Sequence, residues 1–336
     1  MLMQERGAVM RPATFAGFGD AYVAVLGEVL SRTEYENAPR GNPSLECLDV
    51  AFRLADPRRR LPVLAGRTVN VVFHLAETLW YLSGRDDLAM PAYYAPRMAA
   101  YSADGVTMTG TAYGPPLREQ WDRVLELLVA DPDSKRAVIT FFRPAELAVP
   151  NNPDVSCAIA VQFLLREGRL HMSVVMRGND AYRGMVGDVF AFTFIQEFMA
   201  ARLGVRLGTY AHHAASMHVN LADLPAARRA LDGEPRHVAL PSMPAMPPDA
   251  SWADVQTVCE QEEALRTGAT KHTVETIDAL DLDPYWRQLI LVFEVYRQIK
   301  HETDRPVDAA TLAGLDPAYR RPIVGRWPRR MPELPR

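Results

Sequence analysis

The stretch "MRGNDAYRGMVGDVFAF", from Met176 to Phe192, combines charged residues and glycines with a strongly apolar end. It runs into "VFAFTFIQEFMAARLG", residues 189–204, whose length and apolar content predict a buried helix. Asp188 stands directly before that helix. Buried carboxylates are rare unless they are paired or functional. Asp188 therefore either caps the helix N-terminus or belongs to a site, and one residue can do both.

The segments around this stretch predict a mixture of helices and strands. Apolar residues recur at helical spacing at 15–32, 68–84, 116–134 and 283–299. Alternating apolar runs predict strands at 47–55, 135–142 and 207–221, and a hairpin at 157–178 that turns at "REGR". Residues 85–116 are rich in Gly, Pro, Tyr and Thr and predict an irregular, ligand-lining region. Because strands and helices do not alternate regularly, we expect an α+β fold around a mixed sheet.

Composition limits the function classes open to the chain. Its 336 residues carry a formal net charge of -4 and a pI near 6.1, which gives no global attraction to nucleic acid or to membranes. Three cysteines without a CxxC pair argue against a disulfide framework or a metal site and favour a reducing cytoplasm. No run of about 18 apolar residues occurs, and the charges within residues 1–15 are unlike a signal peptide. We expect a soluble cytoplasmic protein.

Six short motifs occur in order along the chain: "AETLWYLSG", "DPDSKR", "SC", "RGNDAYRGMVGD", "MHVN" and "LDGEPRHVALP". At matching spacing they resemble the motifs "HELLWFLxG", "xPDSRR", "PCH", "RSxDxxLGxPFN", "THxY" and "LxREPxxxP" of the folate-dependent thymidylate synthase family. The resemblance covers roughly residues 35–240. It implies one thymidylate synthase-like domain over 1–336, with sheets stacked across a dimer interface. We expect a divergent helical part at 241–336.

The resemblance assigns the nucleophile to Cys157. Carbon 5 of a pyrimidine becomes reactive only after a thiolate adds to carbon 6, which requires one activated cysteine. A free cysteine is otherwise most often a small core residue, and that reading stays open for Cys157 taken alone. A nearby cation would lower the pKa of the thiol, and the resemblance nominates Arg177.

The remaining site residues are carried over from the matching motif positions. Arg40 and Arg177 correspond to arginines that bind the nucleotide phosphate. Lys135 and Arg136 correspond to an arginine pair that reaches the neighbouring subunit's site, which implies an obligate homodimer. Lysine keeps the charge at position 135 but loses the two-pronged hydrogen bonding of arginine. Each of these side chains is otherwise a solvated surface charge.

Further positions match residues around the base, the sugar and the cofactor. Glu77 corresponds to the general acid or base, and Tyr113 to a tyrosine near the nucleophile. His218 corresponds to a histidine that binds the sugar. The resemblance implies 5,10-methylenetetrahydrofolate as cofactor, with the pterin held at Asp180 and further contacts from Gly184 and Trp80.

Asp188 departs from the family pattern in a chemically informative way. Thymidylate synthases have asparagine there, which pairs with uracil N3–H and O4. Cytosine reverses that edge, because its N3 accepts and its 4-amino group donates. A protonated Asp188 complements both groups, and an ionised Asp188 complements N3-protonated cytosine, which also eases thiolate attack. We therefore interpret Asp188 as a selector of cytosine.

The same exchange marks cytidylate hydroxymethylases within the family, in which water attacks the activated methylene and tetrahydrofolate is released. Ala158 and Ser156 replace the histidine and proline beside the nucleophile. Gly178 replaces a phosphate-binding serine and Asn220 a sugar-binding tyrosine, and both changes favour a 2′-hydroxyl. CMP hydroxymethylases such as that of the mildiomycin pathway are similar in their carboxylate selector and small residue after the arginine. The resemblance thus implies CMP as substrate and a role in nucleoside antibiotic biosynthesis.

Other functions stay open at this point. The first alternative to a CMP hydroxymethylase is a dCMP 5-hydroxymethylase, and the second is a thymidylate synthase that methylates dUMP. A non-catalytic nucleotide- or RNA-binding homologue would not need Cys157, Glu77 or Arg177. A cysteine hydrolase would pair Cys157 with one of three histidines, His212, His213 or His218, but the sequence lacks an oxyanion-hole signature.

Overall fold

The structure is a computed structural model that describes residues 11–64, 66–232 and 242–332. Most of the last family-like motif, "LDGEPRHVALP", and most of the N-terminal segment 1–15 lie outside the described residues. Within the described part, no helix combines the length and the apolar character needed to cross a bilayer.

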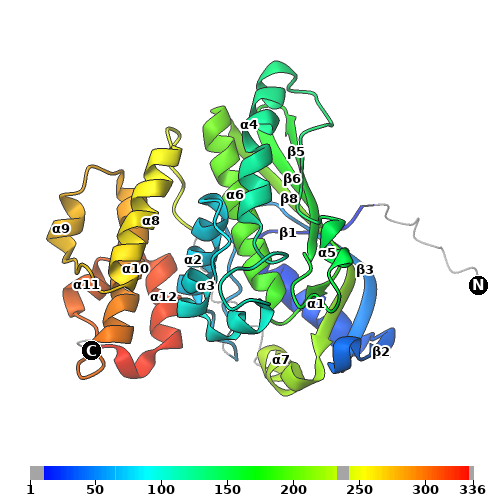
Figure 1. Ribbon diagram of the computed structural model, residues 1–336, viewed down its shortest axis with the longest axis horizontal. Coiled ribbons are helices and arrows are strands. Elements are labelled where there is room, and N and C mark those ends of the chain that lie inside the picture. The colour runs from blue at the N-terminus through cyan, green and yellow to red at the C-terminus, as the bar shows by residue number, and fades with distance from the viewer. Residues whose placement is uncertain (1–10, 65, 233–241, 333–336) are drawn as a thin grey trace, which may run out of the picture.

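One mixed eight-stranded sheet forms the centre of the fold (Figure 1). Its main path runs β1-β3-β8-β6-β5-β4, with β2 paired to β3 and β7 paired to β8. The β3–β8 and β5–β6 pairs are antiparallel, whereas β6–β8 and β1–β3 are parallel. The strands are β1 (Ala13–Phe15), β2 (Tyr35–Asn37), β3 (Ser44–Leu54), β4 (Val138–Thr140), β5 (Ala158–Arg166), β6 (Arg169–Met176), β7 (Asn179–Asp180) and β8 (Arg206–Asn220). The expected α+β fold with a mixed sheet is confirmed.

Helices pack against this sheet and against one another. Helices α1 and α6 contact the strands directly, and α2 packs on α6. The helices in the first two thirds of the chain are α1 (Phe18–Ser31), α2 (Val71–Leu82), α3 (Ala89–Tyr94), α4 (Gly114–Ala130), α5 (Ala145–Ala148), α6 (Gly184–Leu203) and α7 (Leu224–Asp232), with short 3-10 turns η1 (Pro39–Gly41), η2 (Pro96–Tyr101) and η3 (Leu221–Asp223). Every residue of α2 is buried, so this helix lies inside the molecule.

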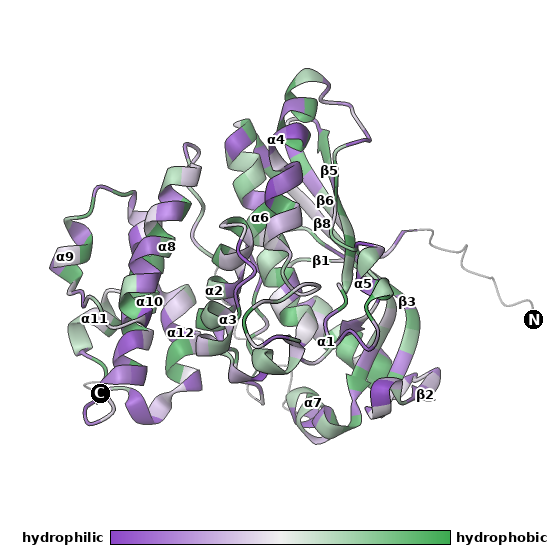
Figure 2. Ribbon diagram, viewed as in Figure 1, coloured by the Kyte–Doolittle hydropathy of each residue, from purple (hydrophilic) through white to green (hydrophobic). Residues whose placement is uncertain are grey.

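The burial pattern explains why these segments form these elements. Along β8, alternate side chains such as Tyr210, His212 and Ala214 are buried, as expected for a strand with one face on the core. Purple and green residues alternate along α4 in Figure 2, since one side of this helix faces solvent. Helix α6 is buried around most of its circumference, as expected for a helix between a sheet and a second helix layer.

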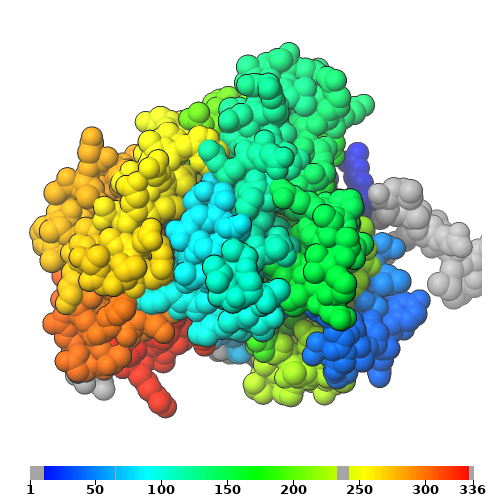
Figure 3. All heavy atoms as spheres, viewed as in Figure 1, coloured from blue at the N-terminus to red at the C-terminus, as the bar shows by residue number. Residues whose placement is uncertain are grey.

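Five C-terminal helices form a separate cluster of elements beside α2 and α3. They are α8 (Trp252–Arg266), α9 (Val274–Asp278), α10 (Pro284–His301), α11 (Ala309–Ala313) and α12 (Pro317–Arg326), followed by the turn η4 (Pro328–Arg330). Figure 3 shows their yellow-to-red atoms against the cyan atoms of α2 and α3. Helices α8, α10 and α12 all contact α2.

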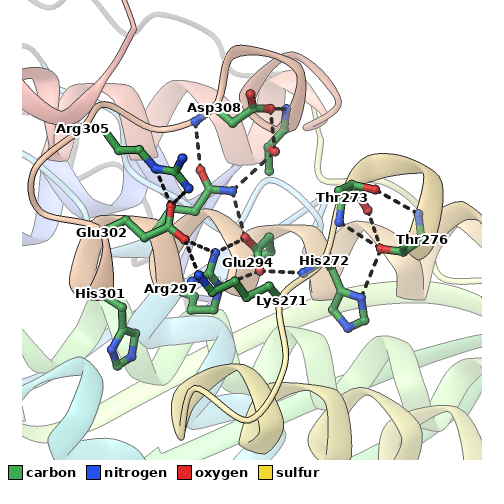
Figure 4. Close-up of polar contacts among 12 residues, drawn as sticks. Lys271, His272, Thr273, Thr276, Glu294, Arg297, His301, Glu302, Arg305 and Asp308 are labelled. Carbon is green, nitrogen blue, oxygen red and sulfur yellow. Dashed lines mark hydrogen bonds and ion pairs between the residues drawn. The ribbon is translucent and has the colours of Figure 1, made fainter.

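A buried ionic network holds α10 to the loops around it (Figure 4). Arg297 donates to both Glu294 oxygens at 2.8 and 2.7 Å and to Glu302 at 2.9 Å. The side chains of Glu294 and Arg297 are 0% and 4% exposed. The backbone N–H of His272 also donates to Glu294, which ties the loop before α9 to α10.

Two local expectations need correction. The strand expected at 135–142 is only three residues long, because the chain before Val138 belongs to the turn after α4. The central helix begins at Gly184, with Arg183 as its N-cap, so the helix-cap interpretation of Asp188 is wrong. The side chain of Asp180 accepts from the backbone N–H groups of Tyr182 and Arg183 and so starts the helix earlier.

Candidate active site

Cys157 lies at the entrance of β5, where the β5–β6 hairpin brings Arg177 beside it. The backbone N–H of Arg177 donates to the Cys157 carbonyl at 2.8 Å. Its side chain donates to the carbonyls of Ser156 and Val155, each at 2.8 Å, and reaches the Cys157 sulfur at 3.8 Å. The guanidinium group is therefore held in place by backbone oxygens, next to the thiol.

The electrostatic balance at Cys157 differs from the expected one. Burial raises the pKa of the thiol, and the charges of Asp188 and Asp154 raise it further. Arg177 and Arg40 act in the opposite direction, but they do not compensate for the burial. Arg177 thus lowers the pKa of the thiol, as expected, but burial outweighs this effect, and in the free protein the thiol is protonated at neutral pH.

Asp154 holds the loop before Cys157 in place by hydrogen bonds to the segment 109–111. The Asp154 carboxylate accepts from the backbone N–H groups of Thr109, Gly110 and Thr111 at 2.8–2.9 Å. A Cβ atom on Gly110 would lie 2.3 Å from the Asp154 carbonyl oxygen, so only glycine permits this approach. The irregular region 85–116 thereby packs directly against the segment that carries the nucleophile.

Tyr113, the N-cap residue of α4, and Glu77, on α2, both lie close to Asp188. The backbone N–H of Ala158 donates to the Tyr113 hydroxyl at 3.1 Å, which places the ring beside the thiol. Glu77 is buried on α2, and desolvation, followed by the nearby charge of Asp188, raises its pKa to about 8. A Cβ atom on Gly187 of α6 would lie only 2.9 Å from a Glu77 carboxylate oxygen. The two helices therefore bring Glu77 close to the turn that carries Asp188.

Asp188 points from the second turn of α6 toward this group. Burial raises its pKa to about 7, although a hydrogen bond from Asn179 at 2.7 Å lowers it. Asp188 also acts electrostatically on Cys157, Glu77 and Tyr113. The structure thus gathers the nucleophile, two carboxyl groups and a tyrosine from four separate segments of the chain.

The candidate phosphate ligands divide into two groups. Arg40 donates to the Pro153 carbonyl at 3.0 Å and so lies near the Cys157 loop, as Arg177 does. Arg40 adopts a left-handed backbone conformation with φ of 52°, which is uncommon for a non-glycine residue and is typical of functional loops. Lys135 and Arg136 are exposed and lie elsewhere. Val138, which follows them on β4, pairs with Gln162 of β5. Gln162 is five residues beyond Cys157, so the two positions are roughly 16 Å apart along the strand.

The candidate sugar and cofactor residues cluster where β7 pairs with β8. Asp180 is opposite His218 in the register, and Asn220 donates to Asp180 at 3.0 Å. This contact occupies the Asn220 amide nitrogen and leaves its oxygen as an acceptor for another group. A Cβ atom on Gly178 would have its nearest neighbour 3.9 Å away, so this position has open space around it.

The residues expected to bind the folate fit it only in part. Asp180 is half-buried and accepts three hydrogen bonds, from Tyr182, Arg183 and Asn220, whereas a carboxylate has about four acceptor positions. It therefore retains capacity for a ring N–H donor. Gly184 sits against Asp180, with its missing Cβ 3.5 Å from the Asp180 Cβ. Trp80, by contrast, is fully buried in the core.

The histidines give no support to a cysteine–histidine hydrolase. His212 is buried and hydrogen-bonded to Asn179 and Tyr210, and His213 lies within 3.4 Å of Asp49. No hydrogen bond between Cys157 and a histidine occurs among the described residues. Nor do these residues contain a group of three or more His, Cys, Asp or Glu side chains placed to hold a metal ion.

Sequence reasoning missed Asn179 and Asp154, which hold site residues in place, and considered His212 only as a possible partner of Cys157. Asn179 and Asp154 each stand within three residues of a predicted site residue, so their position was a usable signal. Nothing in the sequence indicated the contact between His212 and Asn179, because it joins β8 to β7, residues 33 positions apart in the chain.

Comparison with known proteins gives independent information on the family of the chain. Residues 20–258 match the family model described as thymidylate synthase. A deoxyuridylate hydroxymethyltransferase of Bacillus phage SP01 is 34% identical over 220 residues, which is 60% of this chain and 57% of that protein. One from Delftia phage PhiW-14 is 30% identical over 217 residues, 60% of each chain. A putative thymidylate synthase of Methanocaldococcus jannaschii is 37% identical over 103 residues, 30% of this chain and 46% of that one. The chain spans between about half and three fifths of the length of these relatives.

Proposed function

The chain belongs to the thymidylate synthase family, and we propose that it attaches a hydroxymethyl group to carbon 5 of CMP. The one-carbon unit would come from 5,10-methylenetetrahydrofolate and the hydroxyl group from water. The observation that carries this proposal is Asp188, a half-buried carboxyl group near both Cys157 and Glu77. Burial raises its pKa to about 7, so near neutral pH it is available as a hydrogen-bond donor as well as an acceptor.

The base edge is read by Asp188. Protonated on one oxygen, it donates to cytosine N3 and accepts from the 4-amino group, so both contacts are complementary. Because the carboxyl group is desolvated, an unmatched contact there is costly, and discrimination against the wrong base is strong. Attack on carbon 6 is also favoured, since a proton held at N3 withdraws electron density from the ring.

Cys157 supplies the nucleophile. Its thiol is protonated in the free protein, so the proton must leave as the base binds. Arg177, fixed by the carbonyls of Val155 and Ser156, stabilises the thiolate at 3.8 Å. Adding the sulfur to carbon 6 makes carbon 5 nucleophilic, which is the condition for receiving the one-carbon unit.

Glu77 acts as the general acid or base beside the ring. Because its pKa is about 8, it carries a proton at neutral pH and can donate it or, once ionised, orient a water molecule. Water orientation matters in this reaction because a water molecule, in place of hydride, completes the product.

Binding of the nucleotide is assigned to residues on both sides of Cys157. Arg40 and Arg177 would hold the phosphate, and the free oxygen of Asn220 would accept from a ribose hydroxyl. The open space at Gly178 allows the nucleotide to shift toward that contact. These features favour CMP over dCMP. Asp180 and Gly184 would hold the folate, which supplies the one-carbon unit when bound, and the buried Trp80 would support them indirectly.

A second candidate substrate is a uridylate, because two of the relatives are named deoxyuridylate hydroxymethyltransferases. An ionised Asp188 would repel uracil O4, which argues against this base unless the carboxyl group is protonated on the oxygen that faces O4. Methylation of dUMP, as in a thymidylate synthase, and nucleotide binding without turnover are the remaining alternatives.

A substrate panel tests the proposal. The chain is incubated with methylenetetrahydrofolate and each of CMP, dCMP, UMP and dUMP, and product mass and dihydrofolate absorbance are followed. We expect the nucleotide product to gain the mass of one formaldehyde unit, no dihydrofolate to be produced, and CMP to be the preferred substrate. Methylated dUMP together with dihydrofolate would contradict it, as would a preference for a uridylate.

Two variants assign the roles. Asp188→Asn should shift the preference from cytosine toward uracil, and Asp122→Asn, an exposed position on α4, serves as the matched control. Cys157→Ala should abolish release of the carbon-5 hydrogen with every nucleotide. If Asp188→Asn leaves the ratio of kcat/KM for CMP and UMP unchanged, Asp188 is not the selector.

A further inference from the structure

A continuous chain of buried hydrogen bonds ends on Asp188. The Tyr210 hydroxyl contacts Nδ1 of His212 at 2.8 Å, and Nε2 of His212 contacts Oδ1 of Asn179 at 2.9 Å. The Asn179 amide nitrogen then donates to Oδ2 of Asp188 at 2.7 Å. Tyr210, His212 and Asn179 are 0%, 1% and 3% exposed. Among the described residues, no hydrogen bond joins any of the three to Cys157, and the chain reaches the carboxyl groups of the site at Asp188.

The direction of these hydrogen bonds follows from the chemistry of the groups. An amide oxygen only accepts and an amide nitrogen only donates, so His212 must donate from Nε2. Burial lowers the pKa of His212 to about 3, so the ring is neutral and its Nδ1 carries no hydrogen. Nδ1 therefore accepts the hydroxyl hydrogen of Tyr210. One arrangement satisfies all four groups.

The reversed arrangement leaves a buried group unsatisfied. It would require Asn179 to turn its oxygen toward a protonated Oδ2 of Asp188, and His212 to donate from Nδ1 to Tyr210. The Tyr210 hydroxyl hydrogen would then need another acceptor, and no second partner for it occurs within 11–64, 66–232 and 242–332. Leaving a buried donor unpaired is unfavourable, so Tyr210 determines the direction of the whole chain.

This direction decides which oxygen of Asp188 carries the proton. A carboxyl group whose proton could move freely between its two oxygens would fit either base. With the proton on the oxygen that faces N3, the group matches cytosine. With the proton on the other oxygen, it matches uracil, which needs a donor at O4 and an acceptor for N3–H. Oδ2 accepts from Asn179, and the unprotonated oxygen of a carboxyl group is the better acceptor, so this contact favours the proton on Oδ1. With the base presented so that Oδ1 faces N3, cytosine is matched at both contacts and uracil is mismatched at both.

We propose that Tyr210, His212 and Asn179 are positioning residues that make Asp188 selective for cytosine by fixing the proton on Oδ1. This inference rests on the proposed function, because it takes Asp188 to meet the base with Oδ1 toward N3. It assigns specificity to a tyrosine hydroxyl that is separated from Asp188 by two other side chains.

Nucleotide affinities test it without any turnover. Dissociation constants for CMP and UMP are measured by calorimetry for the full chain, without folate. Tyr210→Phe removes one hydroxyl group and keeps the ring. The ratio of CMP to UMP affinity should fall by at least about fivefold, the lower limit for a lost bidentate contact. Asn179→Asp replaces the donor with a carboxyl group that shares a proton with Oδ2, and should shift the preference further, toward UMP.

Tyr94→Phe is the matched control, since it removes another buried hydroxyl, which donates to Glu262 at 2.7 Å beside the C-terminal helices. It should leave the ratio unchanged. Thermal unfolding and circular dichroism show whether each variant is folded. If wild-type protein prefers CMP and both Tyr210→Phe and Asn179→Asp keep its ratio, the inference is overturned and the proposed function stands. Equal binding of CMP and UMP by the wild-type chain would overturn the proposed function, and the inference with it.

Discussion

At the scale of single residues, the site is defined by two carboxyl groups that form no ion pair within the described part of the chain. Glu77 and Asp188 lie on facing helices, and burial raises the pKa of each, to about 8 and about 7. In the unfolded chain both groups ionise near pH 4. The folded state retains protons that the unfolded state has lost, so stability decreases as pH rises from about 4 to about 8. Such a loss is typical of residues kept for function.

The raised pKa of Asp188 predicts that CMP binding takes up a proton at alkaline pH. In the proposed complex Asp188 and cytosine N3 would share one proton, whereas above pH 7 the free carboxyl group is ionised. The dissociation constant for CMP should therefore rise by about tenfold per pH unit above that point. Calorimetry in buffers of different ionisation enthalpy measures the proton uptake directly.

Controls separate Asp188 from other groups that titrate nearby. Asp188→Asn should remove the proton uptake, and Glu77→Gln should keep it, which excludes the second carboxyl group. Asp180 also faces Asp188, but its carboxylate is hydrogen-bonded by three donors. An affinity for CMP that stays constant from pH 7 to pH 9 would contradict the assignment.

At the scale of secondary-structure elements, α10 stabilises the helix that carries Glu77. It contacts α2 directly, as α8 and α12 do. Its own position depends on the ionic network in Figure 4, in which Arg297 lies between Glu294 and Glu302. The family match ends at residue 258, so this support comes from a part of the chain that the family model does not cover.

Removing the cation from this network should destabilise the C-terminal helices. Arg297→Met leaves the buried Glu294 without its partner, a change that costs about 3–5 kcal/mol for a buried ion pair. Arg305→Met is the control, because Arg305 is 65% exposed and an exposed ion pair contributes about 0–1 kcal/mol. Urea unfolding followed by circular dichroism compares the two. Equal midpoints for both variants would show that the network contributes little.

At the scale of the whole molecule, the separation of two sets of cations favours a site shared between subunits. Arg40 and Arg177 lie at the Cys157 loop, whereas Lys135 and Arg136 lie more than roughly 16 Å along the sheet from it. Within one chain these groups do not meet around one phosphate. A dimer in which Lys135 and Arg136 reach the partner's site would bring all four cations together.

Mixing two inactive variants tests this arrangement. In a hybrid dimer of Cys157→Ala with Arg136→Ala, one site combines an intact Cys157 with an intact Arg136 from the other subunit. Random exchange should restore about a quarter of wild-type activity, because half of the dimers are hybrids with one complete site each. Mixing Cys157→Ala with Glu77→Gln should restore none, since Glu77 and Cys157 act within one subunit. Failure of the first mixture after verified exchange would place Arg136 outside the neighbouring site.

The sequence by itself determined the mixed α+β fold, the central helix after Asp188 and the hairpin that follows Cys157. These follow from local hydrophobic periodicity, which is a property of neighbouring residues. It also nominated Cys157, because the thiol matches the nucleophile of the family motif, and Asp188, because a carboxylate there departs from that motif. It misjudged the helix start at Gly184, because a side chain four residues earlier, that of Asp180, initiates the helix.

Only the tertiary structure decided the protonation states and the partners of these residues. The pKa of Cys157 depends on desolvation by elements that are distant in sequence, and burial outweighs the arginine that the motif supplies. The hydrogen-bond chain from Tyr210 to Asp188 likewise joins residues of β8, β7 and α6, which the fold brings together. Burial and hydrogen bonding are set by contacts across the fold, and local sequence patterns contain no information about them.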